Sequence, residues 1–292
     1  MFEKKLIVIL GPTGSGKSEM AVKIAQKIKG EIISADSRQI YKGMDIGTGK
    51  ITTKEMKGIP HHLLDIALPN KIFNVVQYRK LALKAMNKIF KKGKIPILCG
   101  GTGFYIQAVI DGIIIPEVKP DWKLREKLEK KSTEQLYNRL KKLDSQRAEI
   151  IDKKNKRRLI RALEIIIKTK SPIPVIDKKP LPYPVLILGI KLEKKELENK
   201  IKKRVKKMFK IGLEKEIKNL VQKYGWLPSL ETIGYQEWSE YFEGKIDRNK
   251  LKELIILHTQ QFTKRQTTWF KRDKRIHWIE NYQKAKKLIK KF

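Results

Sequence analysis

A glycine-rich segment near the N-terminus has the residue types and spacing of a phosphate-binding loop. Its eight residues match the pattern G-x-x-x-x-G-K-[S/T]: Gly11, Pro12, Thr13, Gly14, Ser15, Gly16, Lys17 and Ser18. Glycines let the backbone wrap a phosphate chain, and successive N–H groups then point at the anion. Lys17 adds a positive charge for the terminal phosphates, and the Ser18 hydroxyl can ligate Mg²⁺. The pattern is typical of proteins that bind nucleotides such as ATP.

This chemistry requires a strand before the loop and a helix after it, and the sequence predicts both. Residues 6–10 form an apolar run that predicts a buried strand, and the apolar spacing over 17–28 predicts a helix. Residues 31–36 and 95–99 predict further strands, and 75–90 predicts another helix. Alternation of strands and helices, with fully apolar strands, predicts an α/β fold: a P-loop core with a parallel sheet flanked by helices.

One carboxylate falls where such a sheet binds its ligands. Asp36 ends the predicted strand 31–36, and ligands of open α/β sheets lie beyond the carboxyl ends of the strands. Asp36 could direct Mg²⁺, as the corresponding Asp does in a P-loop hydrolase. It could equally act as a general base that faces the phosphate site, or merely cap an element. Its position favours a functional role.

The middle of the chain follows a different pattern. Residues 121–170 have helical periodicity, heavy charge and no strand signal, and 171–184 contain five prolines that do not suit a helix. An apolar run at 185–190 then predicts a return to the sheet. We therefore expect an all-helical insertion domain at 116–184 within a core formed by 1–115 and 185–292. Helices are expected over 193–224, 235–242 and 247–270, and a short strand over 275–280.

The charge balance is strongly basic. The 292 residues include 67 Lys and Arg against 31 Asp and Glu, a net charge of +36. Such an excess favours a polyanionic partner such as nucleic acid, although a nucleotide-biased genome could also enrich lysine. The single cysteine excludes an internal disulfide framework and a multi-cysteine zinc site. No signal peptide or run of membrane-spanning length is recognisable, so we expect a soluble, cytoplasmic protein with no membrane partner.

Beyond the phosphate loop, an ordered set of motifs resembles one family. Residues 33–48 read ISADSRQIYKGMDIGT, which resembles the signature of tRNA dimethylallyltransferases (isopentenyl-tRNA transferases). Further blocks agree in order: GIPHHLL at 58–64, GGTGFY at 100–105, RLIRALE at 158–164, GYQE at 234–237 and TKRQTTWF at 263–270. The likeness runs from about residue 6 to 270. The chain is thereby identified as a member of this family, of the bacterial type.

The resemblance implies a reaction and its partners. The family transfers a dimethylallyl group from dimethylallyl diphosphate to N6 of adenine 37, next to the anticodon, in tRNAs that read codons starting with U. Diphosphate leaves, and Mg²⁺ is the cofactor. The partners would be dimethylallyl diphosphate and the anticodon stem-loop of tRNA, and the phosphate loop would hold a diphosphate leaving group. We expect a monomer.

The resemblance also implies roles for individual residues. Asp36 matches the family's base, Thr102 matches a residue near the catalytic centre, and Arg204 matches an arginine that supports the diphosphate. Residues 13–18 would grip the diphosphate, with Mg²⁺ on Ser18. The residues expected to contact tRNA are Asp36, Ser37, Arg38, Gln39, Thr102, Arg125, Arg157, Arg158, Leu159, Ile160 and Arg161.

Three other functions remain open on the residues alone. They are a prenyltransferase of the same fold that acts on free adenine nucleotides, a P-loop kinase for a small metabolite, and a nonenzymatic RNA-binding protein. The segment around Phe262, Trp269 and Phe270 has two interpretations, because its aromatic residues alternate with lysines and arginines. They could stack on RNA bases, or they could form the core face of an amphipathic helix.

Overall fold

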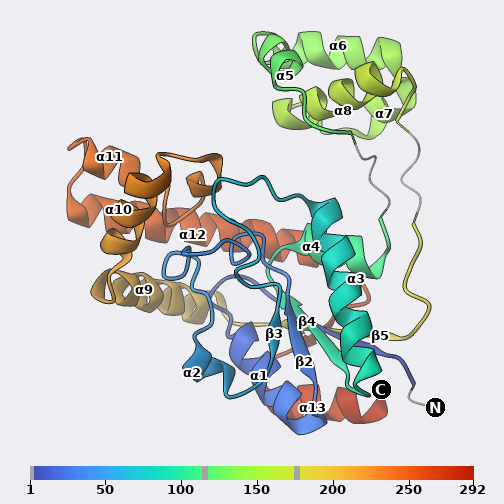
Figure 1. The fold of residues 1–292 in the computed structure, drawn as a ribbon, viewed down its shortest axis with the longest axis vertical. Coiled ribbons are helices and arrows are strands. Elements are labelled where there is room, and N and C mark those ends of the chain that lie inside the picture. Colours follow the sequence, from blue (N-terminus) through green and yellow to red (C-terminus); the bar gives the residue numbers. More distant parts are fainter. Residues whose placement is uncertain (1–2, 114–117, 174–177) are drawn as a thin grey trace. The chain divides into compact units, whose positions relative to one another are not determined.

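A computed structural model describes residues 3–113, 118–173 and 178–292 (Figure 1). The chain forms two compact units, one of residues 1–112 with 180–292 and one of residues 113–179. The insertion was expected at 116–184. Residue 116 lies outside the described residues, as do 174–177 of the proline-rich stretch.

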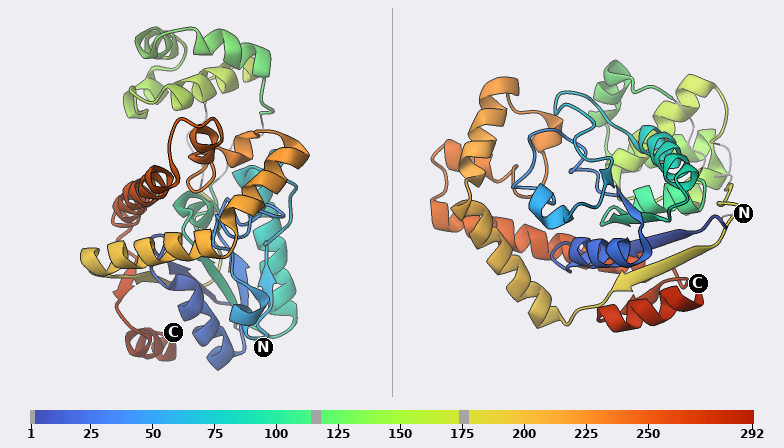
Figure 2. Two further views of the ribbon diagram at one scale, coloured as in Figure 1. Left: turned by 90° about the vertical axis from the view of Figure 1, so that its left-hand side faces the viewer. Right: turned by 60° about the horizontal axis from the view of Figure 1, so that its bottom comes forward.

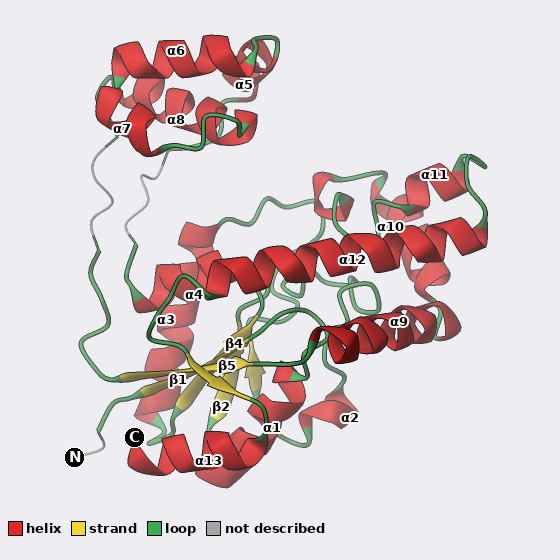
Figure 3. Cartoon of the chain, turned by 180° about the vertical axis from the view of Figure 1, so that it is seen from behind, coloured by secondary structure: helices red, strands yellow, loops and turns green. Residues whose placement is uncertain are grey.

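The larger unit is built on six parallel strands, which confirms the expected α/β class. Their order across the sheet is β3-β2-β4-β1-β5-β6. The strands are β1 Leu6–Leu10, β2 Glu31–Ser34, β3 His61–His62, β4 Pro96–Gly100, β5 Val185–Ile190 and β6 His277–Ile279. Figure 3 shows them in yellow. Because β1 lies between β4 and β5, and β2 pairs with β4, the carboxyl ends of β1, β2 and β4 adjoin at one edge.

The helices of this unit largely follow the predicted periodicity. They are α1 Lys17–Ile28, α2 Thr53–Met56, α3 Val75–Lys91, α4 Gly103–Ile110, α9 Lys194–Lys210, α10 Leu213–Tyr224, α11 Trp238–Phe242, α12 Arg248–Phe270 and α13 Tyr282–Lys291, with a 3-10 turn at Pro228–Leu230. The single helix expected over 193–224 is two helices, because Gly212 adopts φ 102°. Helix α4 was not predicted, since its apolar residues leave little polar–apolar periodicity.

Both faces of the sheet are covered, which explains why its strands are apolar throughout. Alternate residues of β1 point to opposite faces. Leu6, Val8 and Leu10 pack in one cluster with α3 and α4, whereas Ile7 and Ile9 pack in another with α1 and α13 (Figure 2). A third cluster, centred on the fully buried Trp238, joins α9, α10, α11 and α12 to residues 40–44.

The smaller unit consists of α5 Trp122–Glu129, α6 Thr133–Leu143, α7 Ser145–Ile150 and α8 Lys156–Thr169. Its core contains Leu128, Leu136, Leu140, Leu159 and Leu163, all nearly inaccessible to solvent. These positions recur every three or four residues, as expected for helices that each bury one face. Across both units, no described helix has the length and hydropathy to cross a membrane.

A buried carboxylate ties the amino end of β2 to its surroundings. Glu31 is fully buried and accepts hydrogen bonds from Lys92 and Lys94, each at 3.0 Å, and it lies 2.8 Å from His62 Nε2. Burial raises the pKa of Glu31, but the contacts with His62, Lys94 and Lys92 outweigh it and bring the pKa to about 2. The folded state therefore favours the charged carboxylate.

We expect Glu31→Gln to lower the free energy of unfolding by about 1–3 kcal/mol at neutral pH, because the two lysines lose their acceptor. The ordinary pKa of the carboxyl is 4.5, so this contribution is complete above pH 4.5 and disappears as pH falls toward 2. Denaturant unfolding at several pH values measures both effects. Glu19→Gln, which breaks an exposed pair with Lys23, is the matched control and should cost less than about 0.5 kcal/mol. A pH-independent difference between Glu31→Gln and wild type would contradict the assignment.

Candidate active site

The phosphate loop joins β1 to α1 and leaves several N–H groups free for an anion. Gly14 and Gly16 adopt φ 82° and 85°, which the turn requires. The first intrahelical bond of α1 is donated by Met20 to the Gly16 carbonyl, so the N–H groups of Lys17 and Ser18 precede it. Among the described residues, the N–H groups of Gly14 and Gly16 donate to no backbone carbonyl. The loop thus presents free N–H groups where a phosphate-binding loop requires them.

Two partly buried cations lie near this loop. Burial lowers the pKa of Lys17, and the neighbouring Arg204 lowers it further, whereas Asp36 acts in the opposite direction. Burial likewise lowers the pKa of Arg204, again opposed by Asp36. Arg204 comes from α9 and donates to the Thr48 carbonyl at 2.8 Å, and Lys17 Nζ lies 3.4 Å from the Pro12 carbonyl. A bound anion would stabilise the charged forms of both residues.

Asp36 lies two residues beyond β2 with its carboxylate at the pocket. Its Oδ1 accepts from the Arg38 N–H at 2.9 Å and from the Gln39 N–H at 3.4 Å. These bonds fix the carboxylate and leave Oδ2 with no protein donor among the described residues. A carboxylate held in this way can accept a proton from a substrate.

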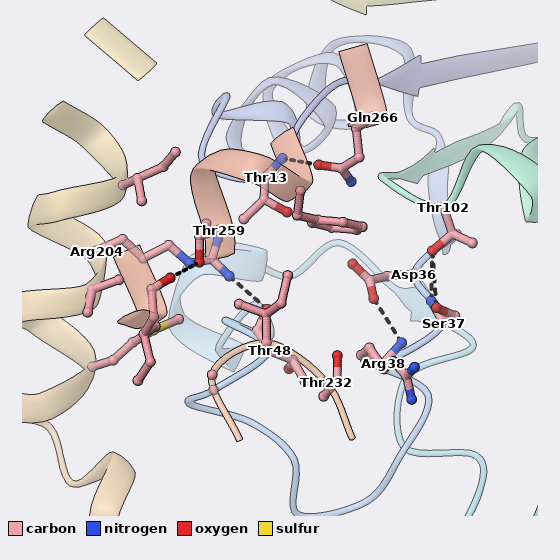
Figure 4. Close-up of a pocket in the computed structure, with 18 residues that line it drawn as sticks. Thr13, Asp36, Ser37, Arg38, Thr48, Thr102, Arg204, Thr232, Thr259 and Gln266 are labelled. Atoms are coloured by element: carbon pink, nitrogen blue, oxygen red, sulfur yellow. Dashed lines mark hydrogen bonds between the residues drawn. The ribbon is translucent and has the colours of Figure 1, made fainter. Parts of the chain in front are cut away.

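Thr102 lies beside Asp36 because β2 and β4 end together. The Thr102 N–H donates to the Ala35 carbonyl at 3.1 Å, and Thr102 Oγ1 accepts from the Ser37 N–H at 3.0 Å. The two segments after the strands are therefore bonded to each other. Figure 4 shows Asp36, Ser37 and Thr102 on one side of the pocket and Arg204 on the other.

The pocket that these residues enclose has a volume of about 200 Å³ and a mixed lining. Its polar lining residues are Thr13, Asp36, Ser37, Arg38, Thr48, Thr102, Arg204, Thr232, Thr259 and Gln266. Aliphatic side chains of α9 and α12 also line it: Ile201, Val205, Met208 and Ile255. Such a pocket can hold a molecule with an anionic head and a short apolar group, and it presents a carboxylate to a second reactant.

Two residues that hold this site together had no assigned role at the sequence level. Gln266 of α12 accepts from the Thr13 N–H and donates to the Gly101 carbonyl, both at 2.9 Å. Glu216 of α10 accepts from three consecutive N–H groups, at residues 45–47, over 2.7–3.0 Å, and from the Tyr235 hydroxyl at 2.7 Å. Glu216 thus fixes the loop whose Thr48 carbonyl binds Arg204. Their partners lie over 150 residues away in the chain, apart from Tyr235, so no local pattern signals them.

The residues expected to contact tRNA lie in two places, at the pocket of the larger unit and in the smaller unit. Ser37 and Arg38 line the pocket with Asp36 and Thr102. Gln39 does not line it, because its amide donates to the Thr48 and Gly49 carbonyls. In the smaller unit, Arg157 and Arg158 are exposed on α8.

The other four residues of the smaller unit that were expected to contact tRNA also take part in its own packing. Leu159 and Ile160 are 0% and 4% exposed, so their side chains are not available to a partner. Arg125 donates to Glu164 through Nε and Nη2, each at 2.8 Å, and Arg161 donates to the same carboxylate. Glu164 is fully buried, and these bonds, with one from the Asp121 N–H at 2.7 Å, compensate its burial.

The aromatic residues of α12 differ in whether they belong to the core or to the surface. Phe270 is 3% exposed and belongs to the core, and Trp269 packs against the same cluster. Phe262 is 36% exposed, lines the pocket and has the Arg265 guanidinium 5.7 Å from its ring centre. Only Phe262 of the three is therefore placed for stacking.

The donor set fits a magnesium ion held mainly by a phosphate ligand. Ser18 presents an exposed hydroxyl in the first turn of α1. The described residues contain no group of three His, Cys, Asp or Glu side chains that could hold a metal by itself. Mg²⁺ in phosphate sites takes one or two protein oxygens and completes its shell with phosphate and water. Ser18 meets this requirement.

The fold and the site define a class of protein: a P-loop α/β enzyme in which Thr13 of the loop and the Asp36 carboxylate line one pocket. Residues 39–273 match the family model described as IPP transferase, and near-full-length relatives extend the likeness over the phosphate loop. The chain belongs to the IPP transferase family.

The relatives agree over nearly the whole chain. The protein named tRNA dimethylallyltransferase from Pelotomaculum thermopropionicum is 42% identical over 291 residues, which cover 96% of this chain and 92% of the relative. One of the same name from Acetivibrio thermocellus is 40% identical, covering 98% and 95%. The crystal structure of the full-length tRNA isopentenylpyrophosphate transferase from Bacillus halodurans has a TM-score of 0.74 and 35% identity, covering 98% and 94%. A eukaryotic dimethylallyltransferase acting on tRNA has a TM-score of 0.77 and 30% identity, covering 91% and 70%.

For the smaller unit, we expect Glu164→Gln to lower stability by about 2–4 kcal/mol, because two arginines lose their buried carboxylate. Hydrogen exchange of the full chain, followed over residues 118–173, measures the effect on this unit. The control Glu126→Gln breaks an exposed pair with Lys130 and should cost less than about 0.5 kcal/mol. Unchanged protection in Glu164→Gln would refute a structural role for the cluster.

Proposed function

We propose that this enzyme transfers the dimethylallyl group of dimethylallyl diphosphate to N6 of adenine 37 of tRNAs that read codons starting with U. One observation carries the proposal: Thr13 of the phosphate loop, the Asp36 carboxylate and Arg204 line one pocket together with aliphatic side chains of α9 and α12. An allylic diphosphate has the matching anionic and apolar parts. Membership of the IPP transferase family and the names of the relatives support tRNA as the acceptor.

The cradle would act on the leaving group. The N–H groups of residues 14 and 16–18, with Lys17 and Arg204, would bind the diphosphate and stabilise the charge that develops as the C–O bond breaks. The bonding electrons leave with the diphosphate. Bound Mg²⁺, held by Ser18 and the diphosphate, would supply further charge neutralisation. Val205, Met208 and Ile255 would surround the allylic group and exclude the water that could hydrolyse it.

Asp36 would act on the acceptor. An exocyclic adenine amine is a poor nucleophile, so removal of its proton as the N–C bond forms favours the reaction. Oδ1 is held by the Arg38 and Gln39 N–H groups, which leaves Oδ2 to accept that proton. Thr102, which accepts a hydrogen bond from the Ser37 N–H, would position the acceptor adenine beside the Asp36 carboxylate.

The acceptor adenine must leave its stack to enter a pocket of this size. Extrusion costs least in a single-stranded loop, where RNA is usually read. The net charge of +36 would attract the phosphate backbone, and the exposed Arg157 and Arg158 would contribute local contacts. We propose that the enzyme acts as a monomer.

The test of the function combines the purified protein and Mg²⁺ with labelled dimethylallyl diphosphate and one of two acceptors. These are an unmodified tRNA with three adenines at positions 36–38, and AMP. We expect label on the tRNA alone, and none on a tRNA with guanine at position 37. Label on AMP would indicate the free-nucleotide activity instead. No label on either would contradict the proposal.

For Asp36→Asn we expect a loss of about 10²–10⁴-fold in the single-turnover rate, the range of general base catalysis. The amide oxygen can still accept from the Arg38 N–H, so the local fold and the binding of pyrophosphate and tRNA should persist. Quench-flow rates and equilibrium binding separate the two effects. Asp65→Asn, which removes a carboxylate paired with Lys50 outside the pocket, should react at the wild-type rate. A near-normal rate for Asp36→Asn would exclude Asp36 as the base.

For Arg157→Ala and Arg158→Ala we expect weaker tRNA binding with a smaller dependence on salt. Removing one phosphate-binding side chain should reduce the slope of log affinity against log salt by about 0.7–0.9. A salt titration of tRNA binding measures the slope for each variant. Lys287→Ala, an exposed lysine on α13, is the control and should leave the slope within error of wild type. An unchanged slope in both arginine variants would show that neither arginine binds a phosphate.

A further inference from the structure

The side chain of Gln266 is fixed against the phosphate loop. It is 6% exposed, and its carboxamide makes two hydrogen bonds of 2.9 Å, from the Thr13 N–H to Oε1 and from Nε2 to the Gly101 carbonyl. Figure 4 shows Gln266 directed at Thr13. Any side chain at residue 101 would collide with Nε2, so the glycine there is what allows this close approach. Thr13 and Gly101 are both far from Gln266 in the sequence, and together they fix its side chain.

The bond to Thr13 removes one N–H from the anion-binding set. The Ser15 N–H is also occupied, by the Pro12 carbonyl at 3.2 Å, which leaves those of residues 14 and 16–18. Thr13 is the loop residue that lines the pocket, at the end of the loop away from α1. Suppose that two phosphates are bound by the N–H groups at the start of α1. A third phosphate, extending along the loop away from the helix, would then reach Thr13. There it would meet the carboxamide oxygen, an acceptor that cannot bond to a phosphate oxygen.

The space beyond Gln266 also disfavours another phosphate. The pocket there contains the Asp36 carboxylate, whose negative charge would oppose a further anion. The aliphatic groups of Val205, Met208 and Ile255 would desolvate it without offering hydrogen bonds. The cations among the described pocket-lining residues are Arg38 and Arg204, and a bound diphosphate would already engage Arg204. A neutral hydrocarbon suits this space and a charged phosphate does not.

We propose that Gln266 restricts the phosphate loop to diphosphates: its carboxamide occupies the N–H group and the position that a third phosphate would need. This inference rests on the proposed function, because it assumes that the loop binds the diphosphate of the donor. With this restriction, a loop of the form found in nucleotide-binding proteins would bind nucleoside triphosphates weakly. Gln266 would thus determine specificity through the length of the phosphate chain and would take no part in proton transfer.

The test measures binding of inorganic pyrophosphate and inorganic tripolyphosphate by calorimetry, with Mg²⁺ and without tRNA. For wild type we expect pyrophosphate to bind at least tenfold more tightly. For Gln266→Ala we expect tripolyphosphate affinity to rise at least tenfold, with pyrophosphate affinity within about threefold of wild type. Gln266→Asn retains a carboxamide but withdraws it by one methylene, so it should change in the same direction if the alanine variant does not fold. Gln261→Ala, an exposed glutamine on the same helix, should keep the wild-type preference.

The outcomes separate the two proposals. Equal affinities of wild type for both anions, or an unchanged preference in a folded Gln266 variant, would overturn the role of Gln266 and leave the transferase function standing. Failure of wild type to bind pyrophosphate at all would contradict the diphosphate cradle itself, and the inference with it. Thermal unfolding of each variant establishes that it is folded before its affinities are compared.

Discussion

Two partly buried cations that share one nearby carboxylate are the constraint on which the site depends. Lys17 and Arg204 both have their pKa lowered by burial, and Asp36 is the carboxylate that opposes this shift for each. Withdrawing a charge from water is costly, so an anion bound near both cations would stabilise their charged forms. The N–H groups at the start of α1 would bind the same anion.

Much of the larger unit positions these charges. The parallel order β2-β4-β1 brings Asp36, Thr102 and the phosphate loop to one edge, as expected for ligand sites of open α/β sheets. Arg204 comes from outside the sheet and needs further support. The Thr48 carbonyl receives its guanidinium, and Glu216 fixes the preceding loop through three backbone N–H groups. The helical cluster around Trp238 therefore contributes to the chemistry by holding Arg204 opposite Asp36.

The features predicted correctly from the sequence are those that a local pattern of residues determines. The strands are buried on both faces, so their apolar runs stood out, and the phosphate loop has a fixed spacing. Helix α4 could not be predicted in the same way, because its residues are almost uniformly apolar. Gln266 and Glu216 could not be assigned a role, since each acts on residues far away in the chain. Family resemblance suggested Arg125 and Arg161 as tRNA contacts, but a sequence does not show that both arginines bond to the buried Glu164.

In the proposed reaction this phosphate loop holds a leaving group while an allylic carbon is transferred to nitrogen, whereas most P-loop chemistry moves phosphoryl groups. The measurement that tests it most directly uses dimethylallyl diphosphate with ¹⁸O in the oxygen that bridges carbon and phosphorus. Mass spectrometry then locates the isotope after one turnover with tRNA. We expect cleavage of the C–O bond, which leaves all the ¹⁸O in the released pyrophosphate. Recovery of ¹⁸O in dimethylallyl alcohol or in another organic product would show cleavage at phosphorus and would contradict transfer of the allylic carbon.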